Sequence, residues 1–137
     1  MTSHYLYLSY RNSIQTYSSN KPWDYTIELQ EPLSVADNSL VSLTDAIFPS
    51  GKLEDTIVIR SDICSFNYIN GEKVNFLRIL APDEQAITSL SEPNQIQISR
   101  NCISSIRIRI TNLKGDNYMK IDKKLICLLK ISPPNMN

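Results

Sequence analysis

The chain of 137 residues is predicted to be all-β: an eight-stranded antiparallel β-sandwich wound as a single jelly roll, in one domain spanning 1–137. Three observations predict this fold. The first fifty residues hold three short strand-like runs with no helix between them. An Asn-Gly pair lies between two alternating runs at 70–71, and residues 102–111 alternate strictly between apolar and polar. Many short strands separated by turn residues are typical of sandwiches and barrels.

The N-terminal strands are separated by polar or proline-containing segments. The first is the aromatic run HYLYLSY at 4–10, the second is WDYTIEL at 23–29, and the third is SLVSLTDAIFPSG at 39–51. A polar break at 11–22 precedes the second strand, and the sequence QEPLSVADN at 30–38 is predicted to be a turn. These elements predict three strands with different turn chemistry between them.

The middle of the chain is predicted to contain a tight hairpin. Asn-Gly favours a two-residue turn because both central residues need positive φ, so Ser65–Ile69 should pair with Lys73–Leu80. The β-branched run Thr56–Arg60 predicts a strand before the hairpin. After it, Ala81–Pro93 is bracketed by prolines and is expected to be a long surface loop.

The C-terminal third contains the clearest alternation. Gln95–Ser99 and Cys102–Thr111 both have period two, which predicts half-buried antiparallel strands. In the second of these, isoleucines should face the core and arginines the solvent: Ile106, Ile108 and Ile110 against Arg107 and Arg109. A turn cluster at 112–122 leads to Lys124–Ile131, whose nearly continuous apolar content predicts a strand that is buried on both faces or central in its sheet. Residues 132–137 are expected to form a frayed tail.

Two connections are too long for hairpins, at 11–22 and 81–94. Such segments can carry the chain from one sheet to the other. Long crossings favour Greek-key or jelly-roll winding over an up-and-down barrel.

Composition is ordinary for a soluble globular protein, with 42% apolar and 20% charged residues. No apolar run is long enough to span a bilayer, and the N-terminus lacks the features of a secretory signal. The three cysteines, Cys64, Cys102 and Cys127, are odd in number and widely spaced. We therefore expect buried or half-buried reduced thiols and a reducing compartment.

Charge is unevenly distributed along the sequence although the formal net charge is zero. Residues 1–98 carry six basic and twelve acidic side chains, a net of −6, and residues 99–137 carry eight basic and two acidic ones, a net of +6. The two segments could interleave in one sandwich and mix their charges. Alternatively, opposed charged faces could pack head-to-tail or against an acidic partner. A zero net charge argues against a dedicated nucleic-acid binder.

The sequence offers little catalytic chemistry. Its only histidine, His4, lies at the N-terminal end and is expected to be solvated. We find no nucleophile elbow, phosphate-binding glycine loop or metal-ligand spacing. We expect no enzyme activity, no cofactor and no metal.

Three features are candidates for contact with a partner. Arg107 and Arg109 project from one face of a strand, although a charged solvent-facing surface explains them equally well. Lysines cluster around the last turn at Lys114, Lys120, Lys123 and Lys124, where a solvated loop is the simpler interpretation. Trp23 lies in an aromatic-rich third with Tyr5, Tyr7, Tyr10, Tyr17 and Tyr25; this could be a sugar-binding platform, but core or interface packing is the simpler explanation.

Several of these segments together resemble one family. They are HYLYLSY, NSIQTYSSNKPWDYTIELQEPLSV, NSLVSLTDAIFPSG, ISSIRIRITNLKGDNY and LICLLKI. They resemble the single-jelly-roll minor capsid (penton) proteins of double-jelly-roll DNA viruses, in particular the short forms of polinton/Maverick-like and adintovirus-like elements. The chain departs from that pattern at Ser39–Val41, where a Trp is common, and at Asp45, where a Glu is common.

The resemblance implies a structural virion protein, assembled in the nucleus or cytoplasm of a host cell. Such proteins form homopentamers at icosahedral five-fold vertices and contact the major capsid protein. A minor capsid or cement protein on a facet is a variant of the same role. The alternative from a different class is a lectin-like module that binds carbohydrate or protein, with Trp23 exposed.

Overall fold

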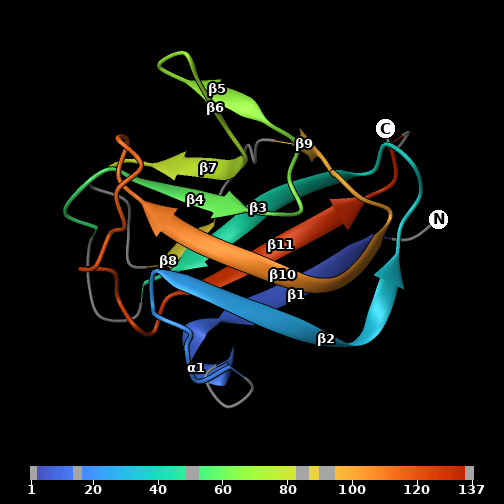
Figure 1. Cartoon of the computed structure of the whole chain (residues 1–137), viewed down its shortest axis with the longest axis horizontal. Helices are drawn as coiled ribbons and strands as arrows, with labels where there is room; N and C mark the ends of the chain where they lie inside the picture. Colours follow the sequence, from blue (N-terminus) through green and yellow to red (C-terminus); the bar gives the residue numbers. More distant parts are fainter. Residues whose placement is uncertain (1–2, 14–16, 49–52, 83–86, 90–94, 135–137) are drawn as a thin grey trace.

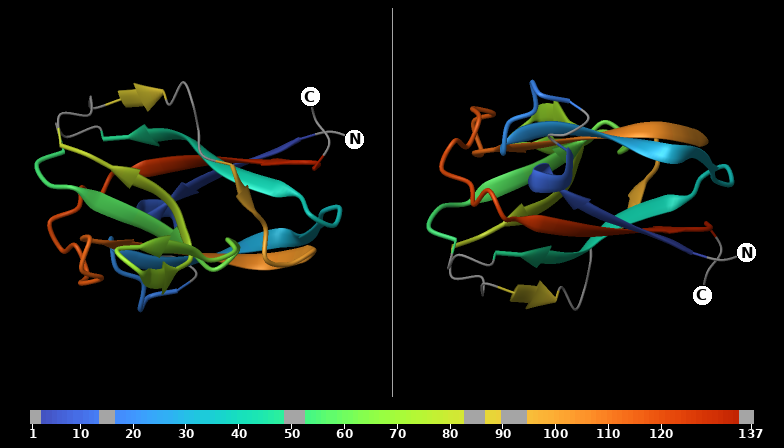
Figure 2. Two further views of the ribbon diagram at one scale, coloured as in Figure 1. Left: turned by 90° about the horizontal axis from the view of Figure 1, so that it is seen from above. Right: turned by 90° about the horizontal axis from the view of Figure 1, so that it is seen from below.

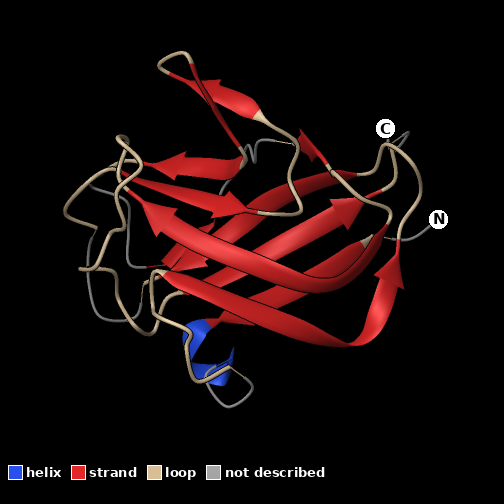
Figure 3. Cartoon of the chain, viewed as in Figure 1, coloured by secondary structure: helices blue, strands red, loops and turns tan. Residues whose placement is uncertain are grey.

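The computed structural model describes residues 3–13, 17–48, 53–82, 87–89 and 95–134. Over these residues the chain is almost entirely strand and turn, with a single four-residue helical turn (Figure 3). The all-β prediction is confirmed. The end of the predicted third strand and most of the predicted 81–93 loop lie outside the described residues.

The elements follow one another as a series of short strands. They are β1 (His4–Ser9), α1 (Tyr10–Ser13), β2 (Asp24–Ser34), β3 (Leu40–Ile47), β4 (Ile57–Ser61), β5 (Asn67–Ile69), β6 (Glu72–Val74), β7 (Phe76–Leu80), β8 (Ile87–Ser89), β9 (Ile96–Gln97), β10 (Cys102–Thr111) and β11 (Ile126–Ser132).

Two antiparallel sheets form the layers of a β-sandwich (Figures 1 and 2). One, called here the β11 sheet, has the order β1-β11-β3, and β8 and β9 both pair with β3 beyond it. The other, called the β10 sheet, has the order β2-β10-β4-β7. Viewed from above or below, the two layers lie one over the other, and β1 begins at the same end of the sandwich at which β11 ends (Figure 2).

The strand pairing is nested. The first strand pairs with the last, β1 with β11, and the second pairs with the one before it, β2 with β10. Further in, β3 pairs with β8 and β9, and β4 pairs with β7. Successive strands β1 to β4 therefore alternate between the two sheets, as the long predicted crossing at 11–22 requires.

The core fills the space between the sheets and consists of aliphatic side chains from their inner faces. In β10, Ile106, Ile108 and Ile110 are fully buried, as their alternation predicts. Ile103 is also buried. A register shift between Ile103 and Ser105 makes an odd-numbered residue face inward before the shift and even-numbered residues face inward after it. Complete burial of one such side chain contributes about 1.5–3 kcal/mol to folding.

β2 is longer than predicted. It continues through Ser34, so much of the predicted 30–38 turn is strand. Pro32 is tolerated because β2 is the edge strand of its sheet, where one side of the backbone needs no partner. The pairing with β10 is also irregular between Glu28 and Leu33, so the sheet does not need a backbone N–H donor at Pro32.

The predicted hairpin forms around Asn70 and Gly71, whose φ values are +50° and +82°. However, the predicted strand Lys73–Leu80 divides at Asn75 into β6 and β7. β5 and β6 stand away from the sandwich as a separate ribbon, while β7 joins β4 (Figure 1). Ile69 and Val74 fix the ribbon by packing with Val58 in a small second cluster.

From residue 81 onward, the structure differs from the prediction mainly at Ser132 and at residues 87–89. β11 is central, as expected, between β1 and β3. Ser132 is a buried residue of β11 and not part of a frayed tail; residues 135–137 of that tail lie outside the described residues. Residues 87–89 form the short strand β8 within the segment predicted to be a loop.

Candidate interaction surfaces

The outer face of the β10 sheet carries an ion-pair network around Arg107. The Arg107 guanidinium donates from Nε to Asp24 Oδ1 at 2.8 Å and from Nη2 to Asp24 Oδ2 at 2.7 Å. This two-bond geometry joins β10 to β2 and raises the pKa of Arg107. The Asp62 carboxylate accepts the Arg107 backbone N–H at 2.9 Å and pairs with Arg100 at 2.7 Å. Arg107 is thus a neutralised side chain on this face.

These contacts bear on the uneven charge of the sequence. The ion pairs Arg100–Asp62 and Arg107–Asp24 each join a basic residue of the last third to an acidic residue of the first two thirds. They exist because β10 lies between β2 and β4. On this face the two oppositely charged segments therefore interleave.

Arg109 lies beside a second arginine and has no carboxylate partner among the described residues. It donates from Nε to Asn117 Oδ1 at 3.1 Å and from Nη2 to the Gly115 carbonyl at 3.2 Å. Its cross-strand neighbour on β4 is Arg60, which donates from Nε to Thr111 Oγ1 at 3.0 Å. The sequence does not indicate this pair, because 48 intervening residues separate its members and only the strand register brings them together.

The predicted lysine cluster is solvent-exposed on the connection between β10 and β11. Lys120, Lys123 and Lys124 are all exposed, as is Lys114. Within this connection, Asn112 Oδ1 accepts backbone N–H groups from Lys114 at 2.9 Å and Asp116 at 3.0 Å. Lys114 and Lys120 line a shallow groove of about 670 Å³, whereas Lys123 and Lys124 do not.

One side of this groove is fixed by a tyrosine. The Tyr118 hydroxyl donates to Asp55 Oδ2 at 2.8 Å, which ties the connection to the segment before β4. Partial burial and this carboxylate together raise the pKa of Tyr118 to about 12. Exposed Met119 adds an apolar patch next to the lysines.

Trp23 is half-buried and packs against the main core just before β2. Its carbonyl accepts the Ile110 backbone N–H at 2.8 Å, so it continues the pairing of β2 with β10. Tyr25 is buried, and Tyr10 packs on it with ring centroids 6.3 Å apart. The N-terminal aromatic residues therefore do not share one surface, and Trp23 is a packing residue.

The exposed aromatic side chains lie elsewhere, in two places. Tyr5 and Tyr7 are 62% and 59% exposed on the outer side of β1. Phe66 and Tyr68 are 55% and 70% exposed at the projecting β5–β6 ribbon, where the Lys73 ammonium lies 4.6 Å from the Phe66 ring centroid. The alternation of HYLYLSY could have revealed the first pair, since Leu8 is buried when Tyr5 and Tyr7 face outward.

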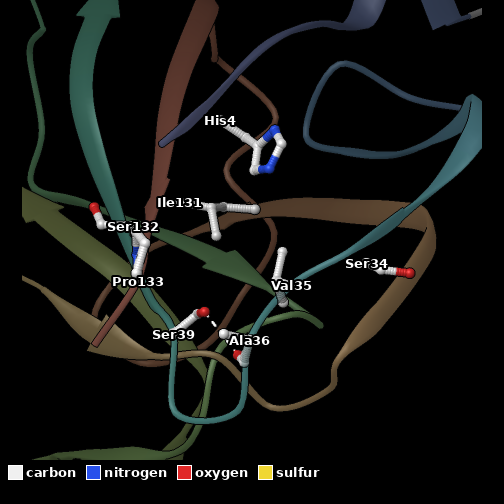
Figure 4. Close-up of a pocket in the computed structure, with 8 residues that line it drawn as sticks. All are labelled: His4, Ser34, Val35, Ala36, Ser39, Ile131, Ser132 and Pro133. Atoms are coloured by element: carbon white, nitrogen blue, oxygen red, sulfur yellow. Dashed lines mark hydrogen bonds between the residues drawn. The ribbon is translucent and has the colours of Figure 1, made fainter. Parts of the chain in front are cut away.

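His4 is a half-buried residue of β1, paired with Ile131, and not part of a solvated end. It lines a pocket of about 210 Å³ together with Ser34, Ser39 and Ser132 (Figure 4). The Ser39 hydroxyl donates to the Ala36 carbonyl at 2.7 Å, and no hydrogen bond joins His4 to any of these serines. The geometry does not form an activated nucleophile.

The cysteines occupy different environments. Cys64 and Cys127 are buried, whereas Cys102 is exposed, contrary to the expectation of buried or half-buried thiols. All three are free. Burial raises the pKa of Cys64 and of Cys127 to about 12.

Across the described ranges, no three His, Cys, Asp or Glu side chains are grouped closely enough to hold a metal ion. Nor does that part of the chain contain a helix of the length and apolarity needed to cross a bilayer. No family model matches the chain, and no curated protein matches it either.

Proposed function

We propose that this chain is a structural virion protein: a penton, or minor capsid protein, that forms a homopentamer at the five-fold vertices and contacts a double-jelly-roll major capsid protein. The observation that carries the proposal is the nested strand pairing. Pairing of first with last, second with next-to-last and so on is the result of rolling one long hairpin over itself, which is how a jelly roll is wound. Eight-strand jelly rolls occur in viral capsid and lectin domains.

β1 supports self-association. It is the edge strand of the β11 sheet, so one side of its backbone has no strand partner within the described part of the chain. Natural edge strands are usually protected by charged residues, proline or bulges. The edge of the other sheet at β2 has Glu31 and Pro32, but His4–Ser9 has no Lys, Arg, Asp, Glu or Pro.

The exposed tyrosines of β1 add contact area beside this edge. Tyr5 and Tyr7 project on the same side of the strand, and the Lys130 ammonium lies 5.9 Å from the Tyr5 ring centroid. Tyrosine is enriched in protein interfaces because it covers apolar area and still hydrogen-bonds. A closed ring of copies would cover this edge by head-to-tail contacts, as five-fold symmetry requires.

The test is the mass of the native assembly measured by light scattering. We expect a pentamer of about 78 kDa, five times the 15.6 kDa chain. The Tyr5→Ser/Tyr7→Ser double variant should be monomeric with unchanged circular dichroism. Tyr68→Ser removes a tyrosine of the β5–β6 ribbon that is at least as exposed, and it should leave the pentamer intact.

Two results would contradict these expectations separately. A wild-type protein that stays monomeric at every concentration and salt level argues against the capsid role. A pentamer that survives in the double variant argues against β1 as the contact. The copy number in purified particles would then distinguish a vertex position from a facet position.

A lectin-like function is the second candidate, favoured by the exposed Phe66 and Tyr68 on the projecting ribbon. Aromatic side chains of this kind can stack on a sugar ring. Glycan-array binding that is lost in Tyr68→Ser and kept in the β1 variant would support it.

A further inference from the structure

A pocket on the outer face of the β10 sheet is lined by three arginines and one carboxylate. Four arginines are gathered around β10 and β4: Arg60, Arg100, Arg107 and Arg109. Two carboxylates pair with them, Asp24 with Arg107 and Asp62 with Arg100. Arg60 and Arg109 have no ion-pair partner among the described residues. Asp24 lies opposite Arg109 in the strand register, but both of its carboxylate oxygens are bonded to Arg107.

These two guanidinium groups belong to residues directly opposite each other in adjacent strands. Like charges in that relation repel and destabilise a sheet. In agreement with this, desolvation lowers the pKa of Arg60, and the neighbouring Arg109 charge lowers it further, although Glu72 acts in the opposite direction. A bound anion would turn the repulsion into attraction.

The positions of both side chains are fixed by neutral acceptors. Arg60 is bonded to Thr111, and its Nη2 lies only 3.3 Å from where a Cβ on Gly115 would be. Arg109 is bonded to Asn117 and to the Gly115 carbonyl. Each guanidinium has five N–H donors, so three of the ten are used in these bonds and seven remain available.

A pocket of about 100 Å³ lies at this place, lined by Arg60, Ser61, Asp62, Asn75, Arg107 and Arg109. Half-buried Asn75, between β6 and β7, adds a side-chain amide. The Asp62 carboxylate would repel an anion, but both of its oxygens are already bonded, one to the Arg107 backbone N–H and the other to Arg100. The pocket thus combines unused donors with a local charge of two.

We propose that this pocket binds a doubly charged tetrahedral oxyanion of the phosphate class, held mainly by Arg60 and Arg109. Planar guanidinium forks bind such anions through paired charge-assisted hydrogen bonds. The pocket lies on the β10 sheet and the proposed contact strand β1 lies in the other sheet, so each proposal is tested by its own variants.

The test is titration calorimetry of the intact protein with sodium phosphate, at an ionic strength kept constant with sodium chloride. We expect saturable binding with one site per chain. Arg60→Gln and Arg109→Gln should each weaken it by about tenfold or more, because each removes charge-assisted hydrogen bonds. Lys123→Gln removes an exposed positive charge that does not line the pocket and should bind phosphate like the wild type.

Arg109→Lys separates charge from geometry. It keeps the charge but lacks the fork, so its affinity should fall between those of wild type and Arg109→Gln. A phosphomonoester, phenyl phosphate, is titrated in parallel. If phenyl phosphate binds as tightly as inorganic phosphate, the site is assigned to a phosphorylated ligand. If only inorganic phosphate binds, the site is assigned to the free ion.

Absence of phosphate binding to folded wild-type protein overturns the proposal. So does binding that Arg60→Gln and Arg109→Gln reduce no more than Lys123→Gln does, because that result means a nonspecific response to net charge. Circular dichroism of every variant confirms that the comparison is made between folded proteins.

Discussion

β1 and β10 share a period-two sequence pattern but differ in what surrounds them. β10 lies inside its sheet, with β2 on one side and β4 on the other, and its outward Arg107 is paired with Asp24. β1 lies at an edge, and its outward Tyr5 and Tyr7 are exposed. The pattern determines which side chains face outward, whereas the neighbouring strands determine whether those side chains are already satisfied or remain available to a partner.

The largest difference is expected on the inner faces of the two strands. Ile108 is fully buried in β10, whereas Leu6 of β1 is only partly buried against the same core. Ile108→Ala should lower the free energy of unfolding by about 2–5 kcal/mol, since it leaves a cavity between the sheets. Leu6→Ala should cost less than about 2 kcal/mol. Urea denaturation of both variants measures this, and equal losses would contradict the distinction between a central and an edge strand.

The buried cysteines make the stability of the fold depend on pH. Outward Cys102 begins β10, and inward Cys127 lies on β11 beside β1. Burial raises the pKa of Cys64 and Cys127 to about 12, compared with about 8.5 for a thiol in an unfolded chain. The folded state therefore keeps protons that the unfolded state loses, and stability that is fully present below about pH 8.5 should fall as the pH rises toward 12.

Two measurements check this expectation. Urea denaturation between pH 8 and 10.5 should show declining stability, with a shallower decline for Cys127→Ala. A thiol reagent at pH 8 should label Cys102 rapidly and the other two only on unfolding. Rapid labelling of all three thiols in the folded protein would contradict the assigned burial.

The sequence predicted the elements whose pattern is local. β10 was predicted over its observed range because alternation is maintained at every residue from Ile106 to Ile110. The Asn70–Gly71 turn was predictable because the two residues themselves favour positive φ. β2 was predicted too short, since Pro32 indicates a strand end unless the strand is already known to be at an edge.

The candidate sites depended on information that a local pattern does not carry. No proline or glycine marks a strand end at Asn75, so the division of 73–80 and the separate β5–β6 ribbon could not be anticipated. The Arg107–Asp24 bond and the Arg60–Arg109 neighbourhood both depend on the register between distant strands. Arg107 and Arg109 were identified as outward-facing, but only the register distinguishes the paired arginine from the one that has no carboxylate partner.

The smallest expected effect on stability comes from breaking the ion pair between Arg107 and Asp24. Asp24→Asn removes the carboxylate that neutralises Arg107. Because the Arg107 and Asp24 side chains are 53% and 29% exposed, the loss of stability should be only about 0.2–1 kcal/mol, and it should become smaller in about 1 M salt, where the screening length is about 3 Å. Glu31→Gln, at an exposed position of the same strand, is the matched control and should change nothing.

The same substitution should act in the opposite direction on the anion pocket. With Asp24 neutral, Arg107 contributes its charge to a pocket that it already lines, so phosphate should bind more tightly while the fold becomes slightly less stable. Calorimetry and urea denaturation of Asp24→Asn measure the two effects independently. A phosphate affinity that falls together with stability would mean that Asp24 positions Arg107 for the pocket. In that case the Asp24 carboxylate would not be what limits the positive charge available to the anion.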